Sequence, residues 1–265
     1  MSPPLRYPTG PASVWHFRAA GGLFCLAAAA ELVGTTWRGT DGAGPYGWLA
    51  LLGAGAWVIG LVWRERLGVV RAWACGSWVV LGSLLAFRLA ARNGFLFGQL
   101  EFTGREAITV AGVPLSVPLL WWLVAGGGFL VVESLWGEWR EGLSAFTATI
   151  ALQMALMILP LVGGLRGYWR WPADAVLSGL SWRLLVAWFT LALVLVFGLV
   201  LTGENLSPVA ARSRRQAWVP AAVLLTLTFV CLEAHLLAHQ WMAVAFSGAN
   251  AVLFGAVIGW HVRGK

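Results

Sequence analysis

Three glutamates, Glu31, Glu133 and Glu233, lie inside long apolar stretches of the chain. An ionisable side chain within a lipid-spanning helix is costly unless it faces protein, water or an opposite charge. Each glutamate is therefore either a structural group, in an ion pair or snorkelling from the end of a span, or a carboxyl group that its apolar surroundings keep protonated. A carboxyl group of the second kind can deliver a proton at neutral pH, which is the chemistry of a general acid.

Two further acids, Glu101 and Asp174, lie in segments that interrupt the apolar pattern. Residues 88–117 are broken by four glycines and Pro114, so they cannot form one straight helix. We expect this segment to re-enter the bundle or to lie along the membrane interface. Residues 163–182 combine Asp174 with tyrosine, tryptophan and arginine. Together the two segments suggest a lid over an opening between helices, with solvated connectors as the alternative.

Metal and thiol chemistry have weaker support. His235 and His239 are four residues apart, a spacing that puts them on one helical face and suits a metal ion. No nearby motif supplies a third ligand, so both are expected at the membrane interface, with a proton relay or a metal site as alternatives. Cys25, Cys75 and Cys231 lie far apart in apolar stretches, where a thiol acts as a small hydrophobe. The sequence predicts no disulfide framework, no metal and no cofactor.

Eight apolar stretches must hold these residues. Hydrophobic residues make up 59% of the chain and charged residues only 11%. A helix needs roughly 20 apolar residues to cross a bilayer core, where backbone groups find partners only within that helix. The predicted spans are residues 14–35, 46–63, 67–89, 113–136, 144–163, 182–202, 218–235 and 241–262. This pattern predicts an all-α, polytopic integral membrane helical bundle of eight transmembrane helices, with seven as the alternative count, in one domain over residues 1–265.

Tryptophan is unusually frequent. The 18 tryptophans exceed what anchoring at the two membrane interfaces requires. Trp57, Trp78 and Trp188 fall near the middle of spans. They are expected to fill helix contacts or to line an apolar pocket.

Basic residues predict the orientation. With eight spans, eleven of the 18 lysines and arginines fall on the side that holds both termini. The positive-inside rule then puts both termini in the cytoplasm, in a bacterial inner membrane. The net charge of +7 does not indicate nucleic-acid binding, because the arginines at 212–215 suit a topology signal or a contact with anionic lipid.

The first polar segment also carries a recognisable motif. Residues 93–103 read Asn-Gly-Phe-Leu-Phe-Gly-Gln-Leu-Glu-Phe-Thr, followed by Gly-Val-Pro-Leu at 112–115 and then by Pro118 and Trp121. This order and spacing resembles the membrane carotenoid-biosynthesis protein family, whose best-known members are carotenoid hydratases that act on acyclic ends. Residues 167–171, with Gly179, Trp188 and Phe189 beyond them, agree with the same family. The resemblance covers residues 88–189.

The resemblance implies a carotenoid-binding bundle in which an acid near the lid protonates a terminal double bond. Glu101 is the first candidate because it lies in the motif, and Glu31 and Asp174 lie on the same side. An ion pair with Arg92 or Arg105 would instead hold Glu101 ionised. The expected substrate-binding side chains are aromatic: Phe97, Phe102, Trp121, Tyr168, Trp169, Trp171, Trp188 and Phe189.

The chain departs from the family's pattern at several positions. Leu100 and Phe102 replace tyrosines, and Leu184 replaces an asparagine. The family's aspartate-rich run before Pro160 reads Ala-Leu-Met-Ile-Leu, and a further expected acid is Phe87. If those acids act in relatives, this chain uses other acids or none.

Hydrating a carotenoid requires an acid of raised pKa, aromatic faces that stabilise a carbocation, and water at one end of a dry cavity. We therefore expect a cofactor-independent carotenoid hydratase of the lyase class. Its substrate would be a carotenoid or another long isoprenoid, and its protein partners would be other carotenoid-pathway enzymes. The alternative is a non-catalytic isoprenoid- or pigment-binding membrane protein. A transporter is disfavoured because the two halves lack matching interrupted spans.

Overall fold

Eight helical segments are long and apolar enough to cross a membrane in the computed structural model, which describes residues 11–98, 100–136, 142–157, 159, 161–170, 182–203 and 218–263. These segments are Val14–Asp41, Gly44–Leu67, Val69–Asn93, Ser116–Glu133, Phe146–Leu165, Arg183–Thr202, Trp218–Leu237 and Trp241–Trp260. They confirm the all-α bundle and the count of eight among the described residues. Their length and composition indicate an integral membrane protein.

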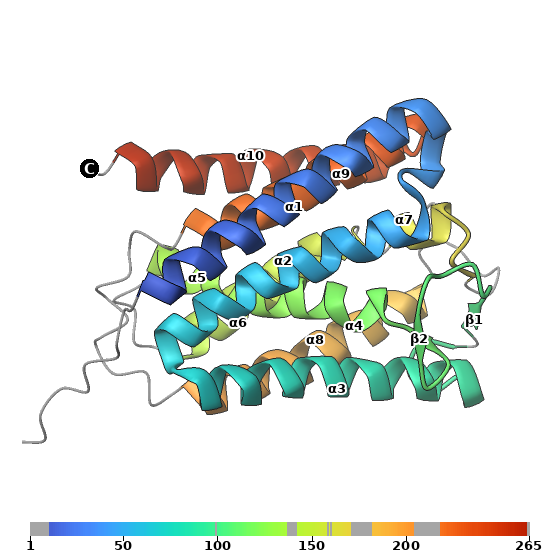
Figure 1. Ribbon diagram of the computed structural model, residues 1–265. Coiled ribbons are helices and arrows are strands. Elements are labelled where there is room, and N and C mark those ends of the chain that lie inside the picture. The colour runs from blue at the N-terminus through green and yellow to red at the C-terminus, as the bar shows by residue number, and fades with distance from the viewer. Residues whose placement is uncertain are drawn as a thin grey trace, which may run out of the picture.

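The helices run side by side, and the connections between them alternate between two ends of the bundle (Figure 1). The helical elements are α1 (Pro11–Arg38), η1 (Gly39–Asp41), α2 (Gly44–Leu67), α3 (Val69–Asn93), α4 (Ser116–Trp121), η2 (Trp122–Gly127), α5 (Gly128–Trp136), α6 (Gly142–Leu156), α7 (Leu161–Leu165), α8 (Trp182–Gly203), α9 (Trp218–Leu237) and α10 (Trp241–Arg263). The start of α1 and the end of α10 lie at one end, which we call the terminal end. The strands lie at the opposite end, the strand end.

The segment formed by α4, η2 and α5 is the centre of the bundle. In the Ser116–Glu133 span 89% of the residues are buried, against 28% in the first and last spans. The π-helical turn η2 contacts α2, α3, α6, α8 and α9. Glycines at 126–128 let the backbone widen there and let neighbouring helices approach closely.

Short strands form between α3 and α4. β1 (Glu101–Phe102) is followed by β2 (Thr109–Val110) and β3 (Val113–Pro114), which pair as a hairpin. Its two loop residues, Ala111 and Gly112, have φ angles of 54° and 79°, the left-handed values that a tight hairpin turn requires.

One predicted boundary was wrong. Residues 90–93, expected beyond the end of the predicted span 67–89, are the last turn of α3. The helix ends only at Gly94, whose φ of 71° suits a glycine cap, and whose amide donates to the carbonyl of Ala90 at 2.9 Å. The interrupted segment therefore begins at Gly94.

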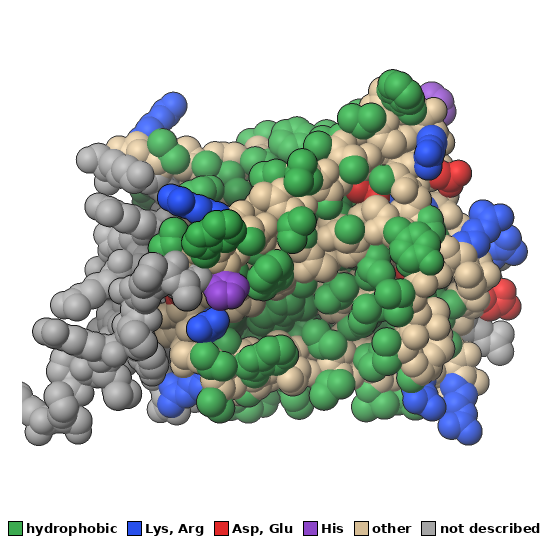
Figure 2. Space-filling model, viewed as in Figure 1, with side chains coloured by type: hydrophobic (Ala, Val, Ile, Leu, Met, Phe, Trp, Pro, Cys, Tyr) green, Lys and Arg blue, Asp and Glu red, His purple; other side chains and the backbone are tan. Residues whose placement is uncertain are grey.

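Hydrophobic side chains cover the flank of the bundle that faces the viewer in Figure 2, and charged side chains gather at its two ends. This distribution matches a bilayer, in which apolar side chains face the lipid tails and ionisable ones stay near water.

Candidate functional site

Two segments far apart in the chain meet at the strand end. β1 pairs antiparallel with β4 (Trp169–Arg170), so Glu101 stands opposite Arg170. Thr103 fastens this contact, because its amide donates to the carbonyl of Tyr168 at 3.0 Å and its hydroxyl donates to the carbonyl of Gly167 at 2.6 Å. The two segments that the sequence paired as a lid thus contact each other.

Glu106 is a half-buried carboxyl group between β1 and β2. Its Oε2 accepts a hydrogen bond of 2.7 Å from the hydroxyl of Ser116, the first residue of α4. Its Oε1 lies beneath the surface with no hydrogen-bond partner in the described part of the chain. Burial raises the pKa of Glu106 to about 7, although the Ser116 hydrogen bond opposes this rise. A proton on Oε1 would have no acceptor among the described residues.

Tyr168 is the neighbouring polar group. Its side chain is buried, and burial raises its pKa to about 12. Arg166 opposes that rise, whereas the charges of Glu31 and Glu106 add to it. Tyr168 is therefore a neutral phenol at physiological pH, within electrostatic reach of both carboxyl groups.

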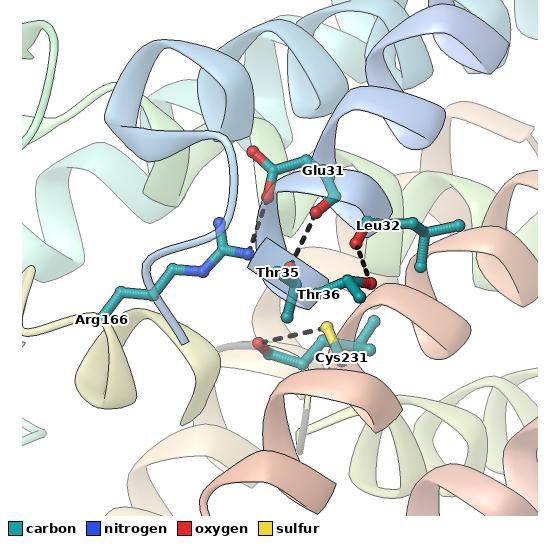
Figure 3. Close-up of polar contacts among 7 residues, drawn as sticks. Glu31, Leu32, Thr35, Thr36, Arg166 and Cys231 are labelled. Atoms are coloured by element: carbon teal, nitrogen blue, oxygen red, sulfur yellow. Dashed lines mark hydrogen bonds and ion pairs between the residues drawn. The ribbon is translucent and has the colours of Figure 1, made fainter. Parts of the chain in front are cut away.

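Glu31 belongs to a fully buried ion pair. Arg166, just after α7, donates through Nη2 to Oε2 of Glu31 at 2.7 Å, and both side chains have no exposed surface. Figure 3 shows the guanidinium reaching from its own segment to the carboxylate on α1. The guanidinium carbon also lies 4.8 Å from the ring centroid of Trp48 on α2, a cation–π distance. Of the two alternatives for Glu31, the structure therefore shows the ion pair.

Glycines make room for this ion pair. A Cβ atom at Gly42 would overlap the Glu31 carboxylate and the Arg166 guanidinium, and one at Gly47 would crowd the carboxylate. The connection between α1 and α2 thus wraps around the two charges. The ion pair fixes α1 against the segment that leads to β4.

The other predicted acids lie in different surroundings. Glu101, the first candidate from the sequence, has an exposed side chain on β1. It lacks the desolvation that the acid role requires. Asp174 lies outside the described residues, as does Trp171.

The glutamates of the later spans have polar partners. Glu133 on α5 pairs with Arg66 on α2. Glu233 on α9 accepts a hydrogen bond of 2.8 Å from the hydroxyl of Thr36 on α1. These contacts link neighbouring helices.

Several of the predicted substrate-binding aromatics form one cluster. Phe97 stacks on Phe87 with ring centroids 4.7 Å apart, and Trp121 packs on Trp188 at 4.3 Å. Phe87 and Trp121 join the two pairs at 6.5 Å. Phe87, which replaces an acid expected from the family, is thus part of an aromatic wall between α3, α4 and α8.

The remaining predicted aromatics differ in exposure. Tyr168 and Trp169 are buried beside the Glu31–Arg166 pair and α7, respectively. Phe102 is half-buried, and Phe189 is exposed on α8.

A comparison with known protein families identifies the family of this chain. Residues 46–254 match the model of the family described as "Carotenoid biosynthesis protein", and this range is more than half of the chain. The chain belongs to the carotenoid biosynthesis protein family. No curated protein and no solved structure matched it. The protein therefore has a role in carotenoid biosynthesis.

The family match covers more of the chain than the resemblance seen in the sequence. The motif covered residues 88–189, whereas the family match begins with α2 and ends within α10. The matched range thus includes α2, α9 and most of α10, which the motif did not reach, whereas α1 lies before it.

Glu106 lies in the interrupted segment but was not among the candidate acids from the sequence. The signal was the hairpin: two β-branched residues, Thr109 and Val110, precede an Ala-Gly turn and Val113. Such a hairpin reverses the chain and brings residues before β2 next to those after β3. The amide of Leu115 accordingly donates to the carbonyl of Ile108 at 2.9 Å.

Proposed function

We propose that this protein adds water to the terminal carbon–carbon double bond of an acyclic carotenoid, with Glu106 as the proton donor. The observation that carries the proposal is the desolvated carboxyl group of Glu106, whose pKa is raised to about 7 and whose Oε1 has no protein partner in the described residues. A general acid works best when its pKa is near the working pH. Two other candidates fit the role less well, because the Glu31 carboxylate is paired with Arg166 and Glu101 is exposed to water.

In the proposed reaction the protonated Glu106 transfers its proton to the less substituted carbon of the terminal double bond. The π electrons form the new C–H bond and leave a tertiary carbocation. A water molecule then forms a C–O bond to that cation and returns one proton to the Glu106 carboxylate. The net change is the addition of one water, with no oxidant, reductant or cofactor consumed.

Two features of the strand end support this chemistry. Aromatic faces stabilise a carbocation by about 0.5–2 kcal/mol per ring, and the wall that contains Phe97 and Trp121 lies at this end of the bundle. The loop around Glu106 is exposed on both sides, at Arg105 and Ile108, so water has a short route to the carboxyl group. Asp174, which lies outside the described residues, remains a second candidate acid from the sequence.

The same proposal includes the location of the protein. The excess of basic residues on the side of the termini supports a cytoplasmic location for both termini, in a bacterial inner membrane. The strand end and Glu106 then face the extracytoplasmic side. Carotenoid would reach the site from the bilayer, and water would reach it from the outer surface.

Expression in a bacterium that accumulates lycopene tests the proposal. Extracted pigments should contain a product heavier by one water when the wild-type chain is present. Glu106→Gln keeps the shape and removes the transferable proton, so it should reduce the product at least about 100-fold, the usual contribution of a general acid. Glu101→Gln is the same change five residues away on an exposed side chain, and it should keep most of the product.

Each contrary outcome has a distinct meaning. Full activity in Glu106→Gln together with loss in Glu101→Gln would make Glu101 the donor, as the sequence alone suggested. Retention of pigment by the purified protein with no hydrated product in any strain would replace catalysis by pigment binding. Product formation by Glu106→Gln at the wild-type level rules out the proposed acid.

A further inference from the structure

A groove runs between α2 and α3 on the flank of the bundle. It has a volume of about 550 Å³ and opens sideways, on a face covered by hydrophobic side chains (Figure 2). Its lining includes residues from Gly53 to Arg64 on α2 and from Val69 to Leu81 on α3. At 1.5 Å per helical residue these stretches are about 16 and 18 Å long. The groove is therefore elongated along the membrane normal and covers about half of the hydrocarbon core.

The recess exists because side chains are missing along it. A Cβ atom at Gly60 would meet no atom within 4 Å, and one at Gly76 would only approach the ring of Trp122 at 3.9 Å. Trp122 forms part of the floor, and its indole nitrogen donates to the carbonyl of Ala56 at 3.1 Å, which fixes the ring. The groove thus has open space at the two glycines and a rigid aromatic floor at Trp122.

The chemistry of the lining selects an extended apolar guest. Three tryptophans, Trp57, Trp73 and Trp122, line it. Arg64, at the end toward the termini, is the one charged side chain among the described residues that line it. A conjugated chain is stiff, so it loses little conformational entropy on binding, and flat rings offer large contact areas.

The groove also leads toward the strand end. Leu119 lines it and lies three residues after Ser116, about 4.5 Å along the helix axis, and Ser116 holds Glu106. An end group that reaches past Leu119 would come close to that carboxyl group.

We infer that the groove between α2 and α3 binds the polyene chain of a carotenoid, which enters sideways from the bilayer. The binding site rests on the family's role in carotenoid biosynthesis. Only the placement of the carotenoid end group near Glu106 rests on the proposed hydration.

Filling the groove tests the inference. Gly60→Leu and Gly76→Leu each place an isobutyl group in the recess, and both changes favour the helix, since leucine is a better helix former than glycine. Gly22→Leu on α1 is the matched control, because its Cβ atom also meets no neighbour within 4 Å but lies outside the groove. Each variant is purified in detergent from lycopene-accumulating cells, and visible absorbance measures pigment per protein.

Gly60→Leu and Gly76→Leu should retain about tenfold less lycopene than wild type, equivalent to about 1.4 kcal/mol, while Gly22→Leu retains the wild-type amount. Thermal melts verify that all variants are folded. Unchanged lycopene in both filled variants overturns the inference, as does loss of co-purified phospholipid in place of lycopene. Repeating the series with Glu106→Gln separates the two proposals. If pigment retention depends on the groove but no hydrated product forms, the groove is supported and the hydration is not. If hydration survives filling of the groove, the role of Glu106 is supported and the groove is not.

Discussion

Ser116 and Glu106 are joined across the β2–β3 hairpin, where the buried hydroxyl at the start of α4 donates a hydrogen bond of 2.7 Å to one carboxyl oxygen. The hydrogen bond orients the carboxyl group and leaves its other oxygen without a partner among the described residues. Because a donated hydrogen bond favours the carboxylate and burial favours the acid, the two effects together set the pKa near 7.

The first prediction concerns pH. Glu106 is the proton donor only while protonated, so the hydration rate should be highest below pH 7 and fall about tenfold per pH unit well above it. Ser116→Ala removes the interaction that lowers the pKa, so the inflection should move to higher pH. The measurement is product formation across pH 5–9 in purified, lipid-reconstituted protein.

A control separates this effect from general damage. Thr190→Ala removes an exposed hydroxyl on α8 whose hydrogen bond is local, to the carbonyl of Val186 at 2.8 Å. Its pH profile should coincide with that of wild type. An inflection that moves to lower pH in Ser116→Ala would contradict the assignment of Glu106.

The second prediction concerns the buried ion pair. Arg166→Met leaves the Glu31 carboxylate without its counter-charge, which should destabilise the fold by about 3–5 kcal/mol. The double variant Glu31→Gln with Arg166→Met removes both charges and should recover part of that loss. The measurement is the temperature at which half of the detergent-solubilised protein loses its monodisperse peak.

Arg170→Met is the matched control, because Arg170 has an exposed side chain on β4. Its effect should be below about 1 kcal/mol, as for other surface charges. Equal melting temperatures for Arg166→Met and Arg170→Met would show that the buried pair does not hold α1 in place.

The third prediction uses two adjacent glycines on α7. A Cβ atom at Gly163 would overlap the buried ring of Trp169, whereas one at Gly164 would lie an ordinary 3.8 Å from the same indole. Gly163→Ala should therefore cost about 1–3 kcal/mol by overpacking, and Gly164→Ala should be neutral or slightly stabilising. Thermal melts of the two variants provide the comparison, and a larger loss in Gly164→Ala would contradict this packing.

Sequence alone determined the membrane class of this protein. The backbone of an apolar stretch of about 20 residues can satisfy its hydrogen bonds in lipid only as a helix, so eight such stretches determine a helical membrane bundle. The motif at residues 93–121 pointed to the right family. The two polar segments were also correctly expected to act together, since both follow an odd-numbered span and emerge at one end.

Tertiary structure decided which acids have partners. Glu31 and Arg166 are 135 positions apart, and only the packing of α1 near α7 makes them a pair. Glu101 and Glu106 lie in one short segment, yet the hairpin buries the second against Ser116 and leaves the first exposed. Desolvation depends on neighbours from other elements, so sequence order could not rank these two carboxyl groups. The groove has the same origin, because Gly60, Gly76 and Trp122 form one recess only when three separate helices pack together.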